Sequence, residues 1–347
     1  MYPIKFKAAV LVKKKKPLLI KNINFYGPLK KGQVLVKISY SGICGKQIDE
    51  INGIGEKDKY IPHCLGHEGT GVVLDIGPGV KRIKKGENVI LHWIKSSGIN
   101  SDVPKYYDDN KKIVNAGWVT TFNEFAVVSE NRLTPIAKKY SLKDLSVFGC
   151  ALPTGVGTIF NIEKIKQDES VALVGVGGVG IFMLQALKIL KIKKIICIDI
   201  KKNALKLAGK TANNLSINFK DKNLIYKILK FTNGKKCNYV FLNTGSESAI
   251  KLGLDICSKN GVLTQVGVPR NIRNTKINMF EILHGKKIQG SMGGRVKIDR
   301  DMKKFIKLYE MKKINIKKTI SKIYNFENIN LAIKQYSKSG GKILIKF

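Results

Sequence analysis

Arginine is scarce in this sequence, although the sequence as a whole is strongly basic. Lysine and arginine number 63 against 25 acidic residues, which gives a formal charge of +38, yet only six of the 63 are arginine. Nucleic-acid recognition favours arginine, whose guanidinium contacts base edges and phosphates in bidentate fashion. The lysines are spread evenly along the chain, so the charge indicates a solvated surface shaped by an AT-rich coding bias. A polyanion partner and an anionic substrate are the alternatives.

Long hydrophobic runs are also missing. No stretch approaches the ~20 apolar residues of a membrane span, and residues 1–12 lack the apolar core and cleavage site of a secretory signal. Without such a signal, six cysteines indicate reduced thiols and metal ligands rather than disulfides. We therefore expect a cytoplasmic protein with no membrane or nucleic-acid partner. The cysteines are Cys44, Cys64, Cys150, Cys197, Cys237 and Cys257.

The chain of 347 residues with 44% apolar content is long enough for two packed domains. Residues 5–90 contain short apolar runs with strand periodicity, including 6–12 and 33–38, which are separated by glycine-rich turns. This pattern predicts a β-rich domain. Residues 95–118 are mostly polar, so we expect a long surface excursion there before strands resume near Phe122.

From about residue 155 short apolar strands alternate with helices, which is typical of a doubly wound parallel α/β sheet. The closing segment, with an amphipathic helix at 301–311 and a strand at 342–347, differs in style and is expected to return to the first domain. The sequence thus predicts one domain made of residues 1–152 and 292–347, and a second of residues 153–291. The strands expected in the second domain are 171–174, 194–199, 239–243, 261–267 and 287–290.

A glycine-rich turn follows the first of these strands. Gly175 permits the tight turn, Gly177 lets the backbone approach a pyrophosphate, and Gly180 lets a helix beginning near Val179 pack on the strand. Asp199 ends the next strand, where its carboxylate can bind an adenosine ribose and repel a 2′-phosphate. A tight turn and an ordinary helix cap are the alternatives for the two features taken singly. Together they predict a Rossmann domain that binds NAD rather than NADP.

Three side chains in separate segments form a candidate metal site. Cys44, His67 and Cys150 would supply two thiolates and an imidazole, a soft tetrahedral set with one open position, as in catalytic zinc sites. Such a metal polarises a carbonyl or lowers the pKa of an alcohol. The spacing of these residues in the sequence does not by itself show that they form one site. Taken singly, each is more simply interpreted as a buried core side chain.

The motifs around these residues resemble those of the zinc-containing alcohol dehydrogenase family of the medium-chain type. The run from Gly66-His-Glu to Gly71, Gly77 and Val80 is similar to its zinc signature, and the similarity extends over essentially the whole chain. The resemblance implies a β-rich GroES-like catalytic domain beside the Rossmann domain. It also implies roles for individual residues: Cys44, His67 and Cys150 as zinc ligands, Glu68 as a carboxylate that exchanges on the metal, Thr154 and Val179 at the nicotinamide, and Trp93 in the substrate pocket.

Several positions depart from the family pattern. Residues 65–149 contain no cysteine, so the second, structural zinc of many members is predicted to be absent, which leaves one zinc per chain. Cys64 is read as a buried thiol. Lys46 stands where a hydroxyl usually starts a proton relay, and it either acts as a base or points outward to Asp49 or Glu50. Gln47 replaces the usual aspartate and is expected to accept a hydrogen bond from His67 through its amide oxygen.

The predicted function is therefore zinc-dependent hydride transfer between NAD and an alcohol or polyol, with sugar derivatives among the candidate substrates, in a homodimer or homotetramer. Two alternatives stay open: a zinc-free NAD(P)H reductase on the same scaffold, and a non-catalytic basic protein that binds polyanions. His63, His92 and His284 have no identifiable partners in the sequence and are read as structural, although His92 would carry the proton if it faced the pocket.

Overall fold

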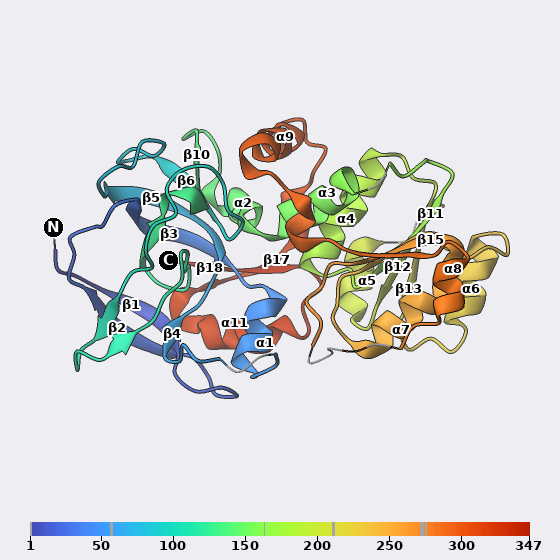
Figure 1. The fold of residues 1–347 in the computed structure, drawn as a ribbon, viewed down its shortest axis with the longest axis horizontal. Coiled ribbons are helices and arrows are strands. Elements are labelled where there is room, and N and C mark those ends of the chain that lie inside the picture. Colours follow the sequence, from blue (N-terminus) through green and yellow to red (C-terminus); the bar gives the residue numbers. More distant parts are fainter. Residues whose placement is uncertain (1, 56–57, 163, 210–211, 271–273, 275) are drawn as a thin grey trace.

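The computed structural model describes residues 2–347 apart from 56–57, 163, 210–211, 271–273 and 275. The chain forms three sheets in two halves, with two β-rich sheets at one end of the molecule and a helix-covered sheet at the other (Figure 1). No helix of the described residues is long and apolar enough to cross a membrane.

The β-rich half holds two sheets. One has the strand order β4-β1-β2-β7-β8, and the other has the order β10-β6-β5-β3-β18-β17, with β9 also paired to β3. Because β18 pairs antiparallel with β3, with Leu344 opposite Gly42, the C-terminal segment completes a sheet of the N-terminal part. The strands are β1 (Ile4–Leu11), β2 (Leu19–Phe25), β3 (Gln33–Gly42), β4 (His63–Cys64), β5 (Glu68–Ile76), β6 (Asn88–His92), β7 (Tyr106–Asp108), β8 (Ile113–Val114), β9 (Phe125–Ser129), β10 (Leu133–Ile136), β17 (Ile320–Asn325) and β18 (Lys342–Lys346).

The third sheet is parallel throughout, in the order β13-β12-β11-β14-β15-β16. This is the 3-2-1-4-5-6 order of a dinucleotide-binding sheet, in which the strand order reverses next to β11. The predicted fold class, a β-rich domain plus a doubly wound parallel sheet, is confirmed. The strands are β11 (Ser170–Val174), β12 (Lys194–Asp199), β13 (Asn214–Asn218), β14 (Cys237–Leu242), β15 (Cys257–Gln265) and β16 (Lys287–Gly290).

Helices cover both faces of this sheet because its strands are apolar on both sides. Along β11, Val171 and Leu173 face one buried cluster, whereas Ala172 and Val174 face another. The first cluster also takes in the helices α3, α4 and α9, and the second α6 and α7. The helices are α1 (Gly45–Ile51), α2 (Leu142–Leu145), α3 (Ala151–Asn161), α4 (Gly178–Ile189), α5 (Lys202–Ala208), α6 (Leu224–Phe231), α7 (Glu247–Ile256), α8 (Met279–Leu283), α9 (Ile298–Glu310), α10 (Ile316–Thr319) and α11 (Ile329–Tyr336).

The expected surface excursion at 95–118 is wrong in its second half. Residues 106–108 and 113–114 form β7 and β8, which extend the first sheet by pairing with β2. Tyr106 is fully buried, and its hydroxyl oxygen accepts a hydrogen bond from the backbone N–H of Val127 at 2.8 Å. The sequence pattern does not predict these two strands, because the segment is mostly polar and its inward side chains are amphipathic.

The predicted division at 152/153 falls inside α3, and that at 291/292 falls between β16 and the short helix η3 (Met292–Arg295). Helix α3 packs closely against both α4 and η3. Gly155 makes this possible, because a side chain there would meet the backbone oxygen of Val179 at 2.6 Å. The two halves are therefore joined through a continuous apolar core rather than through a linker.

Candidate active site

The three candidate metal ligands come from three elements of the β-rich half. Cys44 is the N-cap of α1, His67 immediately precedes β5, and Cys150 lies between the short helix η2 (Ser146–Gly149) and α3. Their ligand atoms all lie within 4.8 Å of one another. Among the described residues, this is the one group of such side chains that is close enough to hold a metal ion.

Strand pairing and one glycine explain how these distant residues meet. Ser41 pairs with Gly69, so the end of β3 lies beside the start of β5 and brings Cys44 to His67. A side chain on Gly149 would meet the backbone oxygen of Leu91 at 2.2 Å. Glycine at this position therefore lets the chain before α3 come close enough to the sheet to deliver Cys150.

The pKa values of the two thiols are shifted in opposite directions. A hydrogen bond from the Cys150 thiol holds the pKa of Cys44 well below its usual range, and His67 acts in the same direction. The pKa of Cys150 is raised by that hydrogen bond and by burial. Burial opposes charge on His67, but the adjacent Cys44 thiolate raises its pKa. The cluster thus brings together two cysteine sulfurs and one histidine ring, which is the donor set that zinc prefers.

Gln47 contacts the ligand set, but not in the predicted orientation. Its Oε1 accepts a hydrogen bond from the backbone N–H of Cys44 at 2.8 Å, and its Nε2 lies 2.6 Å from His67 Nδ1. The expectation that the amide oxygen accepts from His67 is wrong in this structure, because that oxygen caps the N-terminus of α1.

Glu68 is fully buried and lies outside the group of three ligands. Its carboxylate forms an ion pair with Lys342, and it accepts a hydrogen bond from the Ala151 N–H at 3.2 Å. Lys342 Nζ also donates to the Ile43 carbonyl at 2.8 Å. Burial raises the pKa of Glu68. The charge of Glu68, with that of Cys44, raises the pKa of Lys342 in spite of its burial.

Sequence reasoning missed Lys342, which is only 3% exposed. It is one of 57 lysines in the chain. A lysine at the start of an apolar strand is ordinarily expected to be exposed to solvent. Only the return of β18 to β3 shows that this lysine is buried beside Glu68.

Lys46 lies on the outer side of α1. Its Nζ is 3.8 Å from Glu50 Oε1, and the side chain is 40% exposed. The neighbouring Asp49 pairs instead with Arg270 at 3.1 Å, which links α1 to the loop after β15. Of the two arrangements considered for Lys46, the structure shows the outward one with Glu50 as its partner.

Trp93 and Thr154, the predicted pocket and nicotinamide residues, each carry a buried polar atom. Trp93 directly follows His92, which pairs with Glu68 across β5 and β6, and its ring packs against Gly293. Thr154 lies on α3, one turn beyond Cys150. Within the described part of the chain, neither the buried Trp93 Nε1 nor the buried Thr154 Oγ1 has a hydrogen-bond partner. Buried polar atoms without partners are uncommon and point to groups that meet a ligand.

The glycine turn has the geometry expected of a pyrophosphate site. Gly175 has φ +94, which favours glycine, and a side chain on Gly180 would meet the Gly175 oxygen at 2.2 Å. A side chain on Gly177 would meet nothing within 4 Å, so this position opens onto free space at the N-terminus of α4, near Val179. The turn therefore fits an approaching anion at Gly177 and needs glycine for packing at Gly180.

Asp199 and Asn243 hold this turn in place. Asp199 accepts hydrogen bonds from the backbone N–H groups of Val176 at 2.8 Å and of Lys201 at 2.9 Å. Asn243, at the end of β14, donates to the Gly175 oxygen at 2.9 Å, and its buried Oδ1 has no partner among the described residues. The sequence motif gave no reason to select Asn243, because it lies 68 residues from the turn that it contacts.

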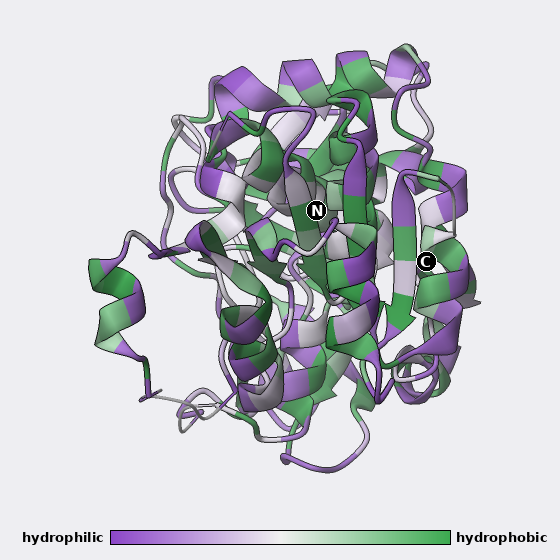
Figure 2. Cartoon of the chain, turned by 90° about the vertical axis from the view of Figure 1, so that its right-hand side faces the viewer, coloured by the Kyte–Doolittle hydropathy of each residue, from purple (hydrophilic) through white to green (hydrophobic). Residues whose placement is uncertain are grey.

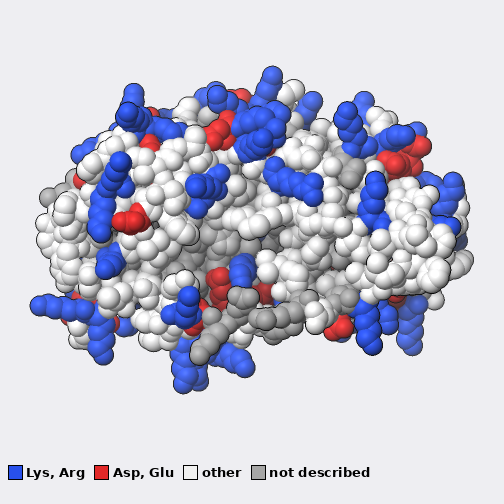
Figure 3. Space-filling view, viewed as in Figure 1, with Lys and Arg blue, Asp and Glu red and all other residues white. Residues whose placement is uncertain are grey.

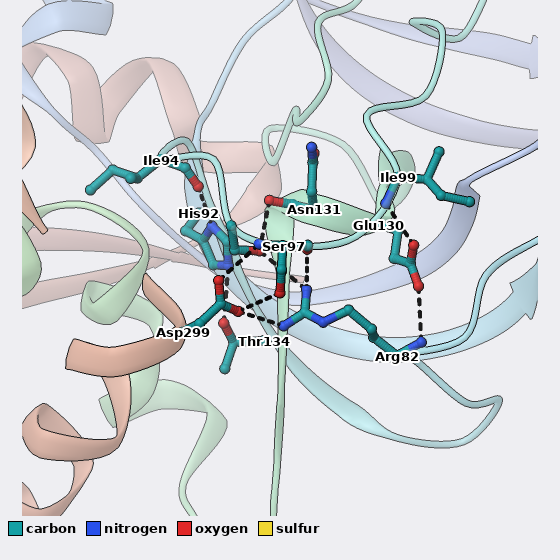
Figure 4. A network of polar contacts seen from close by, with 10 residues as sticks. Arg82, His92, Ile94, Ser97, Ile99, Glu130, Asn131, Thr134 and Asp299 are labelled. Carbon is teal, nitrogen blue, oxygen red and sulfur yellow. Dashed lines mark hydrogen bonds and ion pairs between the residues drawn. The ribbon is translucent and has the colours of Figure 1, made fainter. Parts of the chain in front are cut away.

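The other three histidines and Cys64 lie away from this chemistry. Both ring nitrogens of His92 are engaged, by the Ile94 oxygen at 2.7 Å and by Thr134 Oγ1 at 3.0 Å (Figure 4). His63 contacts Asp58 at 2.9 Å, and His284 contacts the Phe280 oxygen at 2.7 Å. Burial raises the pKa of Cys64 to about 12.

Comparison with known proteins gives a consistent result. The alcohol dehydrogenase GroES-like domain matches residues 30–138, and the zinc-binding dehydrogenase domain matches residues 178–311. Alcohol dehydrogenase 6 of Peromyscus maniculatus is 28% identical over 97% of this chain and 96% of its own length. Alcohol dehydrogenase class-3 of Cereibacter sphaeroides is 26% identical over 93% and 94%. The chain belongs to the zinc-containing alcohol dehydrogenase family.

Solved structures agree with this family in fold. Benzyl alcohol dehydrogenase from Acinetobacter calcoaceticus matches 99% of both chains with a TM-score of 0.87 and 24% identity. An alcohol dehydrogenase from E. coli, solved with NADH, matches 99% of both chains with a TM-score of 0.79 and 20% identity. This member of the zinc-containing alcohol dehydrogenase family is thus an NAD-dependent alcohol oxidoreductase that uses zinc, as the sequence predicted.

Proposed function

We propose that Cys44, His67 and Cys150 bind one catalytic zinc, and that NAD lies across the turn from Gly175 to Gly180. The observation that carries this proposal is the convergence of three ligand atoms within 4.8 Å beside a turn whose Gly177 is open. When bound, the metal supplies a Lewis acid for the substrate oxygen. Glu68 supports the cluster through its ion pair with Lys342 and is assigned no place among the resting ligands.

The cofactor is placed by residues of α3 and α4. Thr154 and Val179 come together because Gly155 lets the two helices approach, so the nicotinamide is expected to lie between them. Thr154 Oγ1 and Asn243 Oδ1 are then available to the cofactor. Asp199 is proposed to select NAD by repelling a 2′-phosphate.

The substrate is proposed to be an alcohol with additional oxygens, either a polyol or a sugar derivative. Trp93 supports this class because its buried N–H has no partner in the described structure and is available to a second substrate oxygen. A purely aliphatic alcohol would leave that donor unsatisfied.

The assay that tests this function follows NADH absorbance with NAD and a panel of aliphatic alcohols, polyols and sugar alcohols. Turnover that is lost with a chelator and restored by added Zn²⁺ is the expected result. Turnover that survives complete removal of the metal would instead favour a zinc-free reductase. No turnover with any substrate, together with binding of a polyanion, would favour a non-catalytic protein.

The charge distribution gives no support to a nucleic-acid partner. Lysine and arginine side chains are scattered over the whole visible face and form no continuous stripe (Figure 3). All six cysteines are unpaired, which supports the proposed cytoplasmic location.

We also propose the domain division that the sequence predicts. Residues 1–152 and 292–347 form one domain, and residues 153–291 form the other.

The proposed homodimer or homotetramer is supported by an exposed apolar surface at the end of the parallel sheet, which we name the α8 surface. It consists of α8 and the edge strand β16. Their exposed apolar side chains are Met279 (68% exposed), Phe280 (69%), Leu283 (77%) and Ile288 (41%). A short, largely hydrophobic helix stands apart from the body of the domain in Figure 2. An unpaired strand edge beside such a surface favours association with a second copy.

A further inference from the structure

Tyr336, the last residue of α11, brings its hydroxyl to the start of α1. A side chain on Gly45 would meet the Tyr336 hydroxyl oxygen at 3.2 Å, which is closer than side-chain carbons ordinarily approach other atoms. Glycine at this position therefore leaves room for the hydroxyl. Tyr336 is only partly buried, and within the described part of the chain its hydroxyl forms no hydrogen bond. The phenol is thus an available donor.

The parallel-sheet half of the molecule holds the other end of Tyr336. Lys201 Nζ donates a hydrogen bond to the Tyr336 backbone oxygen at 2.9 Å and lies 4.7 Å from the centre of its ring. Nearby, Asn203 Nδ2 donates to the Lys338 oxygen at 3.1 Å. The backbone N–H of Lys201 in turn donates to the Asp199 carboxylate at 2.9 Å. Tyr336 therefore reaches from the neighbourhood of Asp199 to the helix that begins beside the metal ligands.

The proposed path of NAD joins the same two places. The cofactor is proposed to extend from Asp199 at the ribose to Thr154 at the nicotinamide, and its pyrophosphate lies between them at the open Gly177. Because Tyr336 spans the same two ends from the β-rich half, its hydroxyl is expected beside the middle of the cofactor.

Lys342 links Tyr336 to the glycine turn. A side chain on Gly178 would meet Lys342 Cδ at 2.5 Å, and Lys342 Nζ donates to the Ile43 oxygen at 2.8 Å. Ile43 lies two residues before Gly45, the residue that the Tyr336 hydroxyl approaches. The glycine turn and the hydroxyl are therefore connected by a short series of contacts at the N-terminus of α4.

We propose that the Tyr336 hydroxyl donates a hydrogen bond to the pyrophosphate of bound NAD. This proposal rests on the proposed position of NAD over Gly177. A neutral phenol suits the role because it offers one directed donor to an anionic oxygen. The same residue then ties the cofactor to both halves of the molecule, since Lys201 holds its ring and backbone while its hydroxyl holds the phosphate.

The test is Tyr336→Phe, which removes the hydroxyl and keeps the ring that Lys201 contacts. Tyr324→Phe is the matched control. Lys322 Nζ lies 4.9 Å from the Tyr324 ring, and the buried Tyr324 hydroxyl also has no hydrogen-bond partner among the described residues. Calorimetry on the full chain measures the dissociation constants for NAD, ADP and adenosine, and denaturant unfolding shows that each variant is folded.

Tyr336→Phe is expected to bind NAD and ADP roughly 10-fold more weakly than wild type, because it loses one hydrogen bond to a charged group. Its affinity for adenosine, which has no phosphate, should be unchanged. In the alcohol assay, the KM for NAD should rise and kcat should not fall, since the lost contact is made before hydride transfer as well as during it. Tyr324→Phe should match the wild type in all of these measurements.

Three results would overturn the proposal: equal NAD affinity in Tyr336→Phe and wild type, an equal loss in both variants, or an equal loss for adenosine and ADP. The last of these would assign the hydroxyl to the adenosine end of the cofactor. A wild type that binds neither NAD nor ADP would overturn the proposed cofactor site itself.

Discussion

At the scale of single residues, Lys46 departs from the family pattern two positions after the proposed zinc ligand Cys44. Its contact with Glu50 and its 40% exposure indicate that the amine pairs at the surface. We therefore expect the Lys46→Met variant to oxidise the alcohol at a rate within a few-fold of wild type, and the pH dependence of this rate to be unchanged. A rate loss of roughly 10²-fold, together with loss of one titration, would assign the amine as a general base.

His92 makes the folded state sensitive to acid. Burial lowers its pKa from the ordinary 6.5 to about 4, and the neutral ring satisfies both partners by donating from Nδ1 to Ile94 and accepting at Nε2 from Thr134. Because the folded pKa is depressed, the unfolded chain binds the proton first as the pH falls. Stability is then lost between about pH 6.5 and pH 4, by about 3 kcal/mol.

The check is denaturant unfolding at several pH values in this window. His92→Gln should show a smaller decline in unfolding free energy than wild type, whatever its stability at neutral pH. His284→Gln, which alters an exposed ring, should decline as the wild type does. Parallel curves for His92→Gln and wild type would contradict the assignment.

At the scale of elements, two glycines of the turn have different roles: Gly177 serves cofactor binding, and Gly180 serves folding. Alanine at Gly177 meets nothing within 4 Å, whereas alanine at Gly180 meets the Gly175 oxygen at 2.2 Å. Gly177→Ala should therefore keep its stability within about 0.5 kcal/mol of wild type. It should nevertheless bind NAD at least about 10-fold more weakly, a loss of roughly 1.4 kcal/mol, because the new methyl group occupies the pyrophosphate position.

Gly180→Ala provides the contrast. Overpacking against the backbone should lower its unfolding free energy by roughly 1–3 kcal/mol. Calorimetry of NAD binding and denaturant unfolding of both variants distinguish the two roles. Equal stability losses in both variants would show that the turn is only structural.

The elements themselves were predictable wherever burial is two-sided. Strand β12 is found from its apolar run, and its predicted bounds, residues 194–199, agree with the structure. The segment 95–118 was not predictable in full, because β7 and β8 depend on an edge of β2 that is distant in sequence. When a strand is stabilised by pairing with a distant strand, the sequence of a polar segment gives little indication that it forms a strand.

At the scale of the whole molecule, the same distinction applies to the candidate site. Cys44, His67 and Cys150 were selected from family motifs and are brought together by the fold. Lys342, Asn243 and the orientation of Gln47 were not accessible to the sequence, because each depends on a contact between segments that only the fold creates. The polar partners of the buried site follow from the topology of the fold, whereas its ligands were found because family motifs surround them.

Assembly is the remaining property at this scale. If two copies associate through the α8 surface, a charge at Leu283, which is 77% exposed, should separate them. Leu283→Asp is expected to raise the dimer dissociation constant at least about 10-fold, the loss of roughly one apolar contact of 1–2 kcal/mol at an interface. Light scattering over a concentration series measures this. Leu331→Asp is the matched control, since Leu331 is an exposed leucine, 48% accessible, on α11. The control should leave the molar mass unchanged at every concentration. A wild type that is monomeric throughout the series, or an equal effect of both substitutions, would remove the α8 surface as the site of association.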